Sequence, residues 1–358
     1  MQSGGFFFAY IYDMINTALV SFGMSGKVFH APFIDTHPQF NLVGSWERSN
    51  KSIQTAYPGT KSYDSYESLL ADPLIDLVVV NSPNDTHYTY TKSALLAGKH
   101  VVCEKAFTNT STEAQELDEL AQKKGLKLAV YQNRRYDADF LTLQNLIQEG
   151  SIGDLLDVQI SFERYRTTLS PKAHKEAVTP GAGLLYDLGP HLVDQALVLS
   201  GMPLAVFADI RITRKVSLVD DYFHILLYYP SHRISLTSGM VFMHPSPGYK
   251  VYGSKGSFIK NRSDIQETEL MAGKKPNAPN WGEEAASDYG TLYTDHNGLI
   301  TSQVIPSVPG NYNLFYDKMA DAIVNNALLP TSAKEATQTI RILEAARNSA
   351  FNKRVVGI

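Results

Sequence analysis

Three titratable residues lie at helical spacing near the middle of the chain. Asp187 and His191 are four residues apart, and Asp194 follows three residues later. On a helix these side chains share one face, while leucines such as Leu188 and Leu192 fill much of the opposite side. A carboxylate that orients an imidazole is the basic unit of general acid–base catalysis. An ion pair on a surface helix has the same spacing, so the spacing alone does not decide between them.

The position of Pro190 predicts where on that helix the catalytic candidates lie. Proline has no backbone N–H and is unfavourable inside a helix, so Asp187 and His191 are expected in the first turns, at the N-terminal end. The helix dipole there favours the neutral form of His191, which is the form that a base needs.

The composition restricts the class of protein. A chain of 358 residues exceeds what one hydrophobic core usually supports, so two domains are expected. A net charge of −4 without a basic patch argues against nucleic acid as a partner. The single cysteine, Cys103, rules out an internal disulfide and fits a reducing, cytoplasmic location. No long apolar segment predicts a membrane span, and the ten histidines form no metal-ligand pattern.

Residues 1–13 differ from the rest of the chain. They contain a short aromatic run without a preceding Lys or Arg, so they match neither a signal peptide nor a membrane span. A second methionine, Met14, directly precedes the first expected strand. We therefore interpret residues 1–13 as a non-native or disordered extension without a role in function.

A glycine turn follows the first expected strand, residues 15–20, and runs into a helix from Lys27. Strand, glycine turn and helix are the context in which a G-x-G-x-x-G pattern binds a dinucleotide. Gly23 would let the backbone approach a pyrophosphate, and Gly26 would let the helix pack closely on the strand. Ser21 replaces the first glycine of the pattern. The predicted cofactor contacts of this turn are Phe22, Gly23, Met24, Ser25 and Gly26.

The end of the second expected strand, residues 40–46, bears on the choice of cofactor. It lies about 20 residues beyond the glycine turn, where such folds contact the adenosine ribose. Glu47 would accept a hydrogen bond from a 2′-hydroxyl and so indicates NAD. Arg48 would pair with a 2′-phosphate and so indicates NADP, and the two residues leave the choice open.

Strands and helices alternate through residues 14–134. Apolar runs at residues 75–80, 100–103 and 126–130 are separated by helical segments, which predicts a doubly wound parallel sheet of the Rossmann type. Ligands bind such sheets at the carboxyl ends of the strands. The residues at those ends, predicted to contact the cofactor, are Ser82, Pro83, Asn84, His87, Glu104, Lys105, Asn133 and Arg134.

Consecutive strands with few intervening helices characterise residues 135–358. They predict an α/β domain with a large, mostly antiparallel open sheet. We assign this domain to substrate binding and, through the apolar outer face of its sheet, to assembly of a homo-oligomer, either a dimer or a tetramer. Residues 261–312 are expected to form loops, with Trp281 as either an anchor or a lid. The strand candidates are residues 156–165, 206–214, 221–229, 233–239 and 249–252.

Three stretches resemble a known family. They are Ala97–Lys105 (Ala-Gly-Lys-His-Val-Val-Cys-Glu-Lys), Tyr131–Arg135 (Tyr-Gln-Asn-Arg-Arg) and Gly183–His191 (Gly-Leu-Leu-Tyr-Asp-Leu-Gly-Pro-His). From Met14 to its C-terminus the chain resembles the Gfo/Idh/MocA family of nicotinamide-dependent sugar and inositol oxidoreductases. The resemblance implies a Rossmann domain and an α/β domain whose open sheet covers the cofactor. Ala106 replaces the proline that usually follows Glu-Lys in this family, where that peptide bond is often cis.

The resemblance also implies roles for individual residues. Lys105 would position the reacting hydroxyl, and Asp187 and His191 would be the substrate-side pair. Arg135 is a further predicted substrate contact. Tyr165 is predicted to contact substrate as well, from its place on an expected strand, where aromatic residues could line either the core or a sugar-binding face. In this hypothesis His191 removes the hydroxyl proton, Asp187 holds the imidazole tautomer, and Lys105 hydrogen-bonds the same oxygen.

The expected reaction is reversible hydride transfer between a secondary hydroxyl of an inositol, sugar or related polyol and NADP or NAD. NADP is favoured by Arg48 and by the resemblance. Two other functions would keep the same fold. One is a sugar- or nucleotide-binding regulatory protein without chemistry, against which the intact Lys105, Asp187 and His191 argue. The other is an NAD-dependent enzyme that cleaves a glycosidic bond, which only product analysis would separate.

Overall fold

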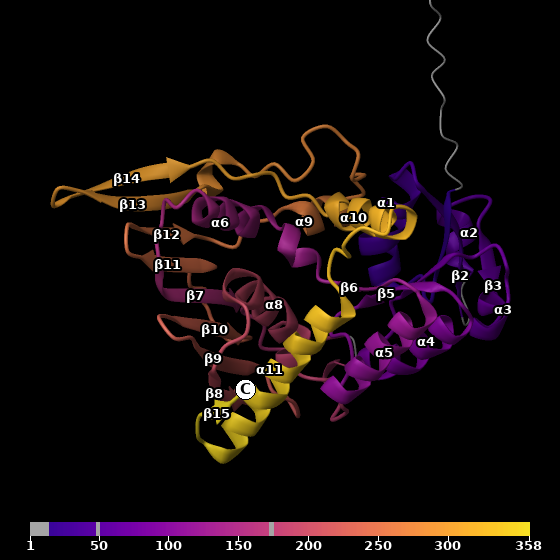
Figure 1. Cartoon of the computed structure of the whole chain (residues 1–358), viewed down its shortest axis with the longest axis horizontal. Coiled ribbons are helices and arrows are strands. Elements are labelled where there is room, and N and C mark those ends of the chain that lie inside the picture. The colour runs from indigo at the N-terminus through magenta and orange to yellow at the C-terminus, as the bar shows by residue number, and fades with distance from the viewer. Residues whose placement is uncertain (1–13, 48–50, 172–174) are drawn as a thin grey trace, which may run out of the picture.

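The computed structural model describes residues 14–47, 51–171 and 175–358. Two β-sheets dominate it, and helices lie between and around them (Figure 1). The expected extension, residues 1–13, and the cofactor candidate Arg48 lie outside the described residues. Within the described ranges no helix combines the length and the apolar character needed to cross a membrane.

The N-terminal half builds a sheet of six parallel strands in the order β3-β2-β1-β4-β5-β6. This is the strand order of a dinucleotide-binding Rossmann sheet, so the predicted doubly wound fold is confirmed. Helices cover both faces, which explains why Leu77–Val80 is buried at every position. The strands are β1 (Ile15–Leu19), β2 (Phe40–Trp46), β3 (Lys61–Tyr63), β4 (Leu77–Val80), β5 (His100–Glu104) and β6 (Leu128–Tyr131).

The helices on the two faces of this sheet form two separate hydrophobic cores. One face carries α3 (Tyr66–Leu70), α4 (Asn84–Leu96) and α5 (Ser111–Lys124). The other carries η1 (Gly26–His30), a π-helical turn that continues into α1 (Ala31–Thr36). The short helix α2 (Ser52–Ala56) follows β2.

The second half contains the predicted open, mostly antiparallel sheet, with nine strands in the order β14-β13-β12-β11-β7-β10-β9-β8-β15. Within the described ranges, β7 and β10 are the one parallel pair of this sheet. One face packs against α6 (Ala138–Gln148), α8 (Gly189–Ser200) and α11 (Ala333–Asn352). The strands are β7 (Leu155–Glu163), β8 (Ala205–Arg211), β9 (Tyr222–Tyr228), β10 (Arg233–Gly239), β11 (Tyr249–Gly253), β12 (Gly256–Lys260), β13 (Gly290–His296), β14 (Leu299–Ile305) and β15 (Val356–Gly357).

The prediction of loops for residues 261–312 is wrong. This stretch contains α9 (Gln266–Met271) and the hairpin β13–β14, which projects at one edge of the sheet (Figure 1). Six of the seven positions of β14 are exposed, so the strand lacks the apolar alternation that would reveal it in the sequence. Trp281 is an anchor, because it is buried against Phe33 and its Nε1 donates to Gln266 at 3.1 Å.

A helix from the second half completes the core of the first. α10 (Asn313–Val324) lies beside α1 (Figure 1), and Phe315, Tyr316 and Met319 are fully buried in the core formed by β1, β2 and α1. The Tyr316 hydroxyl lies 2.7 Å from Nδ1 of His30. The six-stranded domain therefore includes residues from far beyond position 134.

Candidate active site

Lys105 follows β5 directly and points into the second domain. Its Nζ donates to the backbone oxygen of Asp187 at 2.7 Å and to Oδ1 of the same residue at 3.2 Å. The peptide bond between Lys105 and Ala106 is cis. Burial lowers the pKa of Lys105, although the Asp187 carboxylate opposes that change. The predicted meeting of Lys105 with the Asp187 region is thus present in the structure.

Asp187 is the last residue of α7 (Leu184–Asp187) and contacts two ammonium groups. Besides Lys105, Nζ of Lys175 lies 2.6 Å from Oδ1 of Asp187. Burial opposes ionisation of this carboxyl, but the two lysines hold the pKa of Asp187 well below its usual range. Lys175 is absent from the predicted site, because it lies in an irregular segment where spacing gives no signal.

His191 lies in the first turn of α8, one residue after Pro190, as predicted. It is 5 % exposed, and within the described part of the chain its Nδ1 has no hydrogen-bond partner. Burial, together with the charges of Lys105 and Arg134, holds the pKa of His191 well below 6.5. The neutral imidazole that we expected from the helix dipole therefore arises mainly from burial and from neighbouring cations.

The predicted hydrogen bond between Asp187 and His191 is not made in this structure. α7 ends at Asp187, α8 begins at Gly189, and Leu188 between them departs from ideal helical geometry with φ −110°. The regular four-residue spacing is therefore interrupted, and the Asp187 carboxylate binds the two lysines instead. Asp187 and His191 are four residues apart in the chain, but the Asp187 carboxylate positions the Lys105 ammonium group rather than the His191 imidazole.

Arg135, predicted to contact substrate, has a structural role instead. Its Nε and its NH2 group each donate at 2.7 Å to one carboxylate oxygen of Asp194, on α8. Its NH1 group donates to Glu335 and to the backbone oxygen of Pro330. Each guanidinium nitrogen is therefore engaged, and Asp194 belongs to this bridge rather than to the catalytic face.

Tyr165, the other predicted substrate contact, does not face the site. It lies two residues beyond the end of β7, is 53 % exposed and pairs with Val241 in an isolated bridge. Side chains alternate along extended chain, so Tyr165 points away from the side of the sheet that Arg164 and Arg166 share. The sequence pattern alone does not show which side of the sheet Tyr165 faces.

The turn after β1 has the features of a phosphate-binding loop. A Cβ on Gly23 would meet only the Ser21 hydroxyl at 4.0 Å, so the backbone is open to a ligand there. A Cβ on Gly26 would lie 2.5 Å from the Ser21 backbone oxygen, so only glycine fits at that position. Ser21 donates from its backbone N–H to the side chain of Asn81 at 2.9 Å and from its hydroxyl to the Asn81 backbone oxygen at 3.0 Å. Ser21 thus replaces the first glycine without opening the turn, and the residues fit a dinucleotide.

Two other predicted contacts of this turn differ in exposure. The Phe22 ring is buried in the core, and its centroid lies 6.0 Å from that of Tyr57 in an edge-on arrangement. Met24 is largely exposed at the beginning of the helix. Phe22 therefore offers a ligand its backbone only, whereas Met24 has a free side chain.

Glu104, at the end of β5, ties the glycine turn to the sheet. Its Oε1 accepts hydrogen bonds from the Ser25 hydroxyl and from Nε2 of His30, the latter at 3.0 Å. Burial opposes ionisation of Glu104, but the contacts with His30 and Ser25 and the charge of Lys105 lower its pKa to about 2. His30 was not predicted, because a single histidine on a helix face gives no pattern.

Replacing Glu104 by glutamine is expected to reduce stability in a pH-dependent way. The pKa of Glu104 falls on folding from 4.5 to about 2, so its ionisation stabilises the fold above pH 4.5 by about 3 kcal/mol. That contribution disappears as the pH falls toward 2. Urea unfolding at several pH values should therefore show a gap between wild type and Glu104→Gln that narrows below pH 4.5. The exposed Glu119→Gln is the control, and a gap independent of pH would contradict the assignment.

His87, predicted to contact the cofactor, is fully buried on α4 instead. Its Nδ1 lies 2.8 Å from the backbone oxygen of Ala106, and its Nε2 lies 2.8 Å from that of Ser82. Two acceptor oxygens require both ring nitrogens to donate, so the ring is an imidazolium. Burial opposes this charge, but the neighbouring Cys103 and the two carbonyl groups raise the pKa of His87 to about 9. His87 thus joins the loop after β4 to the turn that carries Lys105.

The other residues of the loop after β4 lie between the two domains. Asn84 Nδ2 donates to the backbone oxygen of Gly181 at 3.1 Å, which connects this loop to the segment before α7. The Ser82 hydroxyl accepts from Thr86 at 2.6 Å, and Pro83 precedes the first residue of α4. The loop after β4 therefore lies against the segment that leads into α7.

Glu47 and the residues after β6 are engaged within the protein. Both carboxylate oxygens of Glu47 accept hydrogen bonds at the beginning of α2, from Ser52 and from the backbone N–H of Ile53 at 3.1 Å. Arg134 donates to Glu267 at 2.8 Å, and among the residues that the structure describes its Nε has no hydrogen-bond partner. Asn133, which precedes it, is buried.

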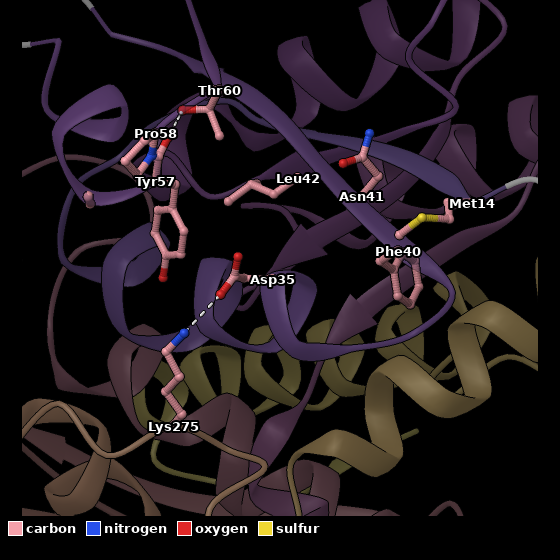
Figure 2. Close-up of a pocket in the computed structure, with 11 residues that line it drawn as sticks. Met14, Asp35, Phe40, Asn41, Leu42, Tyr57, Pro58, Thr60 and Lys275 are labelled. Atoms are coloured by element: carbon pink, nitrogen blue, oxygen red, sulfur yellow. Dashed lines mark hydrogen bonds and ion pairs between the residues drawn. The ribbon is translucent and has the colours of Figure 1, made fainter.

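A surface hollow of about 610 Å³ lies elsewhere on the N-terminal domain (Figure 2). Phe40 and Met14 line it with Tyr57, and an ion pair of 3.2 Å joins Asp35 to Lys275 across one side. Phe40 begins β2 and Met14 precedes β1, so the hollow lies at the amino ends of these strands. Parallel sheets bind ligands at the opposite ends, and no predicted site residue lines the hollow.

The fold and the geometry together define a class of protein. A Rossmann sheet with an open glycine turn presents Lys105 to an Asp187 carboxylate and a neutral His191 in a second domain, which is the arrangement of a nicotinamide-dependent oxidoreductase. The sequence matches the oxidoreductase family NAD-binding Rossmann fold over residues 15–132 and the family's C-terminal alpha/beta domain over residues 144–358. The chain belongs to the Gfo/Idh/MocA family of oxidoreductases.

Several individual proteins are similar to this chain. The chain is 38 % identical over 344 residues to scyllo-inositol 2-dehydrogenase (NADP(+)) IolW of Bacillus subtilis, and the match covers 96 % of each chain. It is 28 % identical over 192 residues to D-glucoside 3-dehydrogenase of Escherichia coli, covering 53 % of this chain and 55 % of that protein. Among solved structures, the oxidoreductase yvaA from Bacillus subtilis superposes with a TM-score of 0.94 at 38 % identity, covering 97 % of this chain and 99 % of that one.

Proposed function

We propose that this chain catalyses the reversible oxidation of a secondary hydroxyl of an inositol, sugar or related polyol with a nicotinamide dinucleotide. The observation that supports this most directly is the contact of Lys105 with Asp187 across the two domains, next to a buried, neutral His191. A secondary alcohol loses a hydride from carbon only as its oxygen loses a proton, so the site needs a base and a cation at one oxygen.

Each side chain answers one of these needs. His191 accepts the hydroxyl proton at a ring nitrogen, because its lowered pKa keeps it neutral at physiological pH. Lys105 donates a hydrogen bond to the same oxygen and favours the developing negative charge. Asp187 fixes the position of Lys105 through its backbone and side-chain oxygens. When bound at the glycine turn, the dinucleotide supplies the electron-pair acceptor.

NADP is the proposed cofactor rather than NAD. The Glu47 carboxylate accepts three hydrogen bonds at the beginning of α2, so most of its acceptor capacity for a ribose hydroxyl is already used. The relative IolW is named as an NADP(+) enzyme, which supports the same choice. We further propose a cytoplasmic homo-oligomer that associates through the outer face of the nine-stranded sheet.

The test is a panel of inositols, aldoses and polyols assayed with NAD and NADP in parallel for formation of the reduced cofactor. We expect turnover of at least one secondary alcohol, a higher kcat/KM with NADP, and loss of turnover in His191→Ala. Tight cofactor binding without turnover of any compound would instead indicate a regulatory protein. Release of a free sugar from a glycoside would indicate the bond-cleaving alternative.

A further inference from the structure

The charges around Asp187 are unbalanced. Lys105 and Lys175 share the Asp187 carboxylate. Arg164, on the extended chain beyond β7, lies within the electrostatic reach of Asp187 and of Arg166. We propose that the substrate carries an anionic group, a carboxylate or a phosphate, near the hydroxyl that is oxidised, and that Arg164 and Lys175 bind this group. This inference rests on the proposed function and specifies its substrate class.

The backbone directs Arg164 and Arg166 to the site. The Arg164 backbone N–H donates to Gly239 at 2.9 Å, and that of Arg166 donates to Met240 at 2.7 Å, so both residues extend the sheet. Alternation places them on the same side as Phe162, which packs against the hydrophobic core of the second domain. The guanidinium carbon of Arg164 lies 4.8 Å from the centre of the Phe162 ring. The same core contains apolar residues of α7 and α8, the two helices that carry Asp187 and His191.

Among the described residues neither arginine forms an ion pair with a carboxylate, although the charges of Asp187 and Glu267 act on Arg164. In the described part of the chain the Arg164 guanidinium makes no ion pair or hydrogen bond, and Nε of Arg166 is buried without a partner. A partly buried guanidinium without an anion is unfavourable, because desolvation is not offset. Burial accordingly lowers the pKa of Arg164, although the Asp187 carboxylate opposes that change. An anion brought by a ligand would compensate these groups.

The carboxylates closest in sequence are already bound elsewhere. Glu163 accepts from the backbone N–H of Ser246 at 2.5 Å. Glu176, beside Lys175, pairs with Arg214 at 3.2 Å. Neither side chain is therefore available to balance Arg164 or Lys175.

Lys175 can exchange its partner for a ligand. Two ammonium groups bind the single Asp187 Oδ1, Lys175 at 2.6 Å and Lys105 at 3.2 Å, which leaves an excess of positive charge. The Lys175 side chain is 34 % exposed, so a ligand has access to it. Asp187 would still hold Lys105 if Lys175 turned to a substrate anion.

The phosphates of the cofactor do not account for these cations. Their predicted position is the glycine turn from Gly23 to Gly26, in the other domain. Among the described residues no hydrogen bond or ion pair joins Arg164 or Lys175 to that turn. The oxidised nicotinamide ring is itself positive, which makes a neutral substrate still less complementary to the site.

The experiment compares matched neutral and anionic compounds with NADP: glucose, glucuronate and glucose 6-phosphate, and myo-inositol with its monophosphate. We expect kcat/KM to be at least about tenfold higher for an anionic compound than for the neutral compound of the same series. The anionic compound with the higher kcat/KM shows whether the recognised group is a carboxylate or a phosphate. In Arg164→Gln and in Lys175→Gln the ratio of kcat/KM for the anionic compound to that for the neutral compound should fall by about tenfold or more. Arg211→Gln, an exposed site on β8, is the matched control and should keep it.

Calorimetry with glucuronate and glucose 6-phosphate on the NADP-bound enzyme measures binding without turnover. Anion binding that weakens in Arg164→Gln, with an unchanged Tm, supports the proposal. A kcat/KM for the neutral compounds that equals or exceeds that for the anionic compounds would overturn the proposed anionic substrate. The proposed function would still stand in that case. Anion binding without turnover of any alcohol would support the anion site and contradict the proposed function. Absence of both preference and anion binding would overturn the anion site.

Discussion

Replacement of Lys105 by methionine is expected to lower kcat by about 10²–10⁴-fold. Methionine has a similar length but carries no charge and no donor, so the reacting oxygen loses the cation that Asp187 positions. Asp187 keeps Lys175 as a partner, which should preserve the local fold. Steady-state kinetics at saturating cofactor, on whichever polyol the wild type oxidises, is the measurement.

The control for this variant is Lys123→Met, at an exposed position on α5. It makes the same chemical change outside the site and should leave kcat within about twofold. Thermal unfolding should show similar Tm values for both variants. Near-normal turnover of Lys105→Met would remove Lys105 from the mechanism.

Asp194→Ala is expected to lower the free energy of unfolding by about 3–5 kcal/mol. The Asp194 side chain is 2 % exposed and binds two nitrogens of Arg135, whose side chain is 13 % exposed. Its removal leaves the Arg135 guanidinium buried, with Glu335 and the backbone oxygen of Pro330 as its remaining partners in the described part of the chain. Urea unfolding followed by circular dichroism provides the measurement.

Two comparisons separate this effect from a general cost of mutation. Asp64→Ala breaks an ion pair with Lys51 whose side chains are 89 % and 62 % exposed, so it should cost less than about 1 kcal/mol. The double variant Arg135→Met/Asp194→Leu removes both buried charges and should recover much of the loss. A loss below about 1 kcal/mol for Asp194→Ala would show that the bridge is not a stabilising element.

Much of the first domain follows from local sequence. Leu77–Val80 is a continuous apolar run because the strand is covered on both faces, and such runs are easily read. Since carboxyl ends of parallel strands meet at one edge, Lys105 could be placed beside the glycine turn without coordinates. Asp187 and His191 were indicated first by their spacing on a helix and then by the family resemblance. In the structure Asp187 contacts Lys105, and the charge of Lys105 lowers the pKa of His191.

The parts that could not be predicted depend on long-range contacts. Spacing shows that Asp187 and His191 are four residues apart, but not that the helix is interrupted at Leu188. It also does not show that Lys175 would take the Asp187 carboxylate. Arg135 looked like a ligand-binding residue because its acidic partners lie 59 and 200 positions away. Charge compensation is decided by the fold.

The place of α10 has a consequence for how this protein can be recombined. Phe315, Tyr316 and Met319 lie late in the chain, yet they are buried in the core of the first sheet, and Tyr316 contacts His30. If two relatives were joined near residue 134, the six-stranded sheet would come from one parent. The buried side chains of α10 that pack on that sheet would come from the other parent. The cofactor-binding domain is therefore built from two separate parts of the chain. To exchange substrate specificity between relatives, the segment between residue 134 and α10 should be transferred, and α10 should stay with the six-stranded sheet of its own parent.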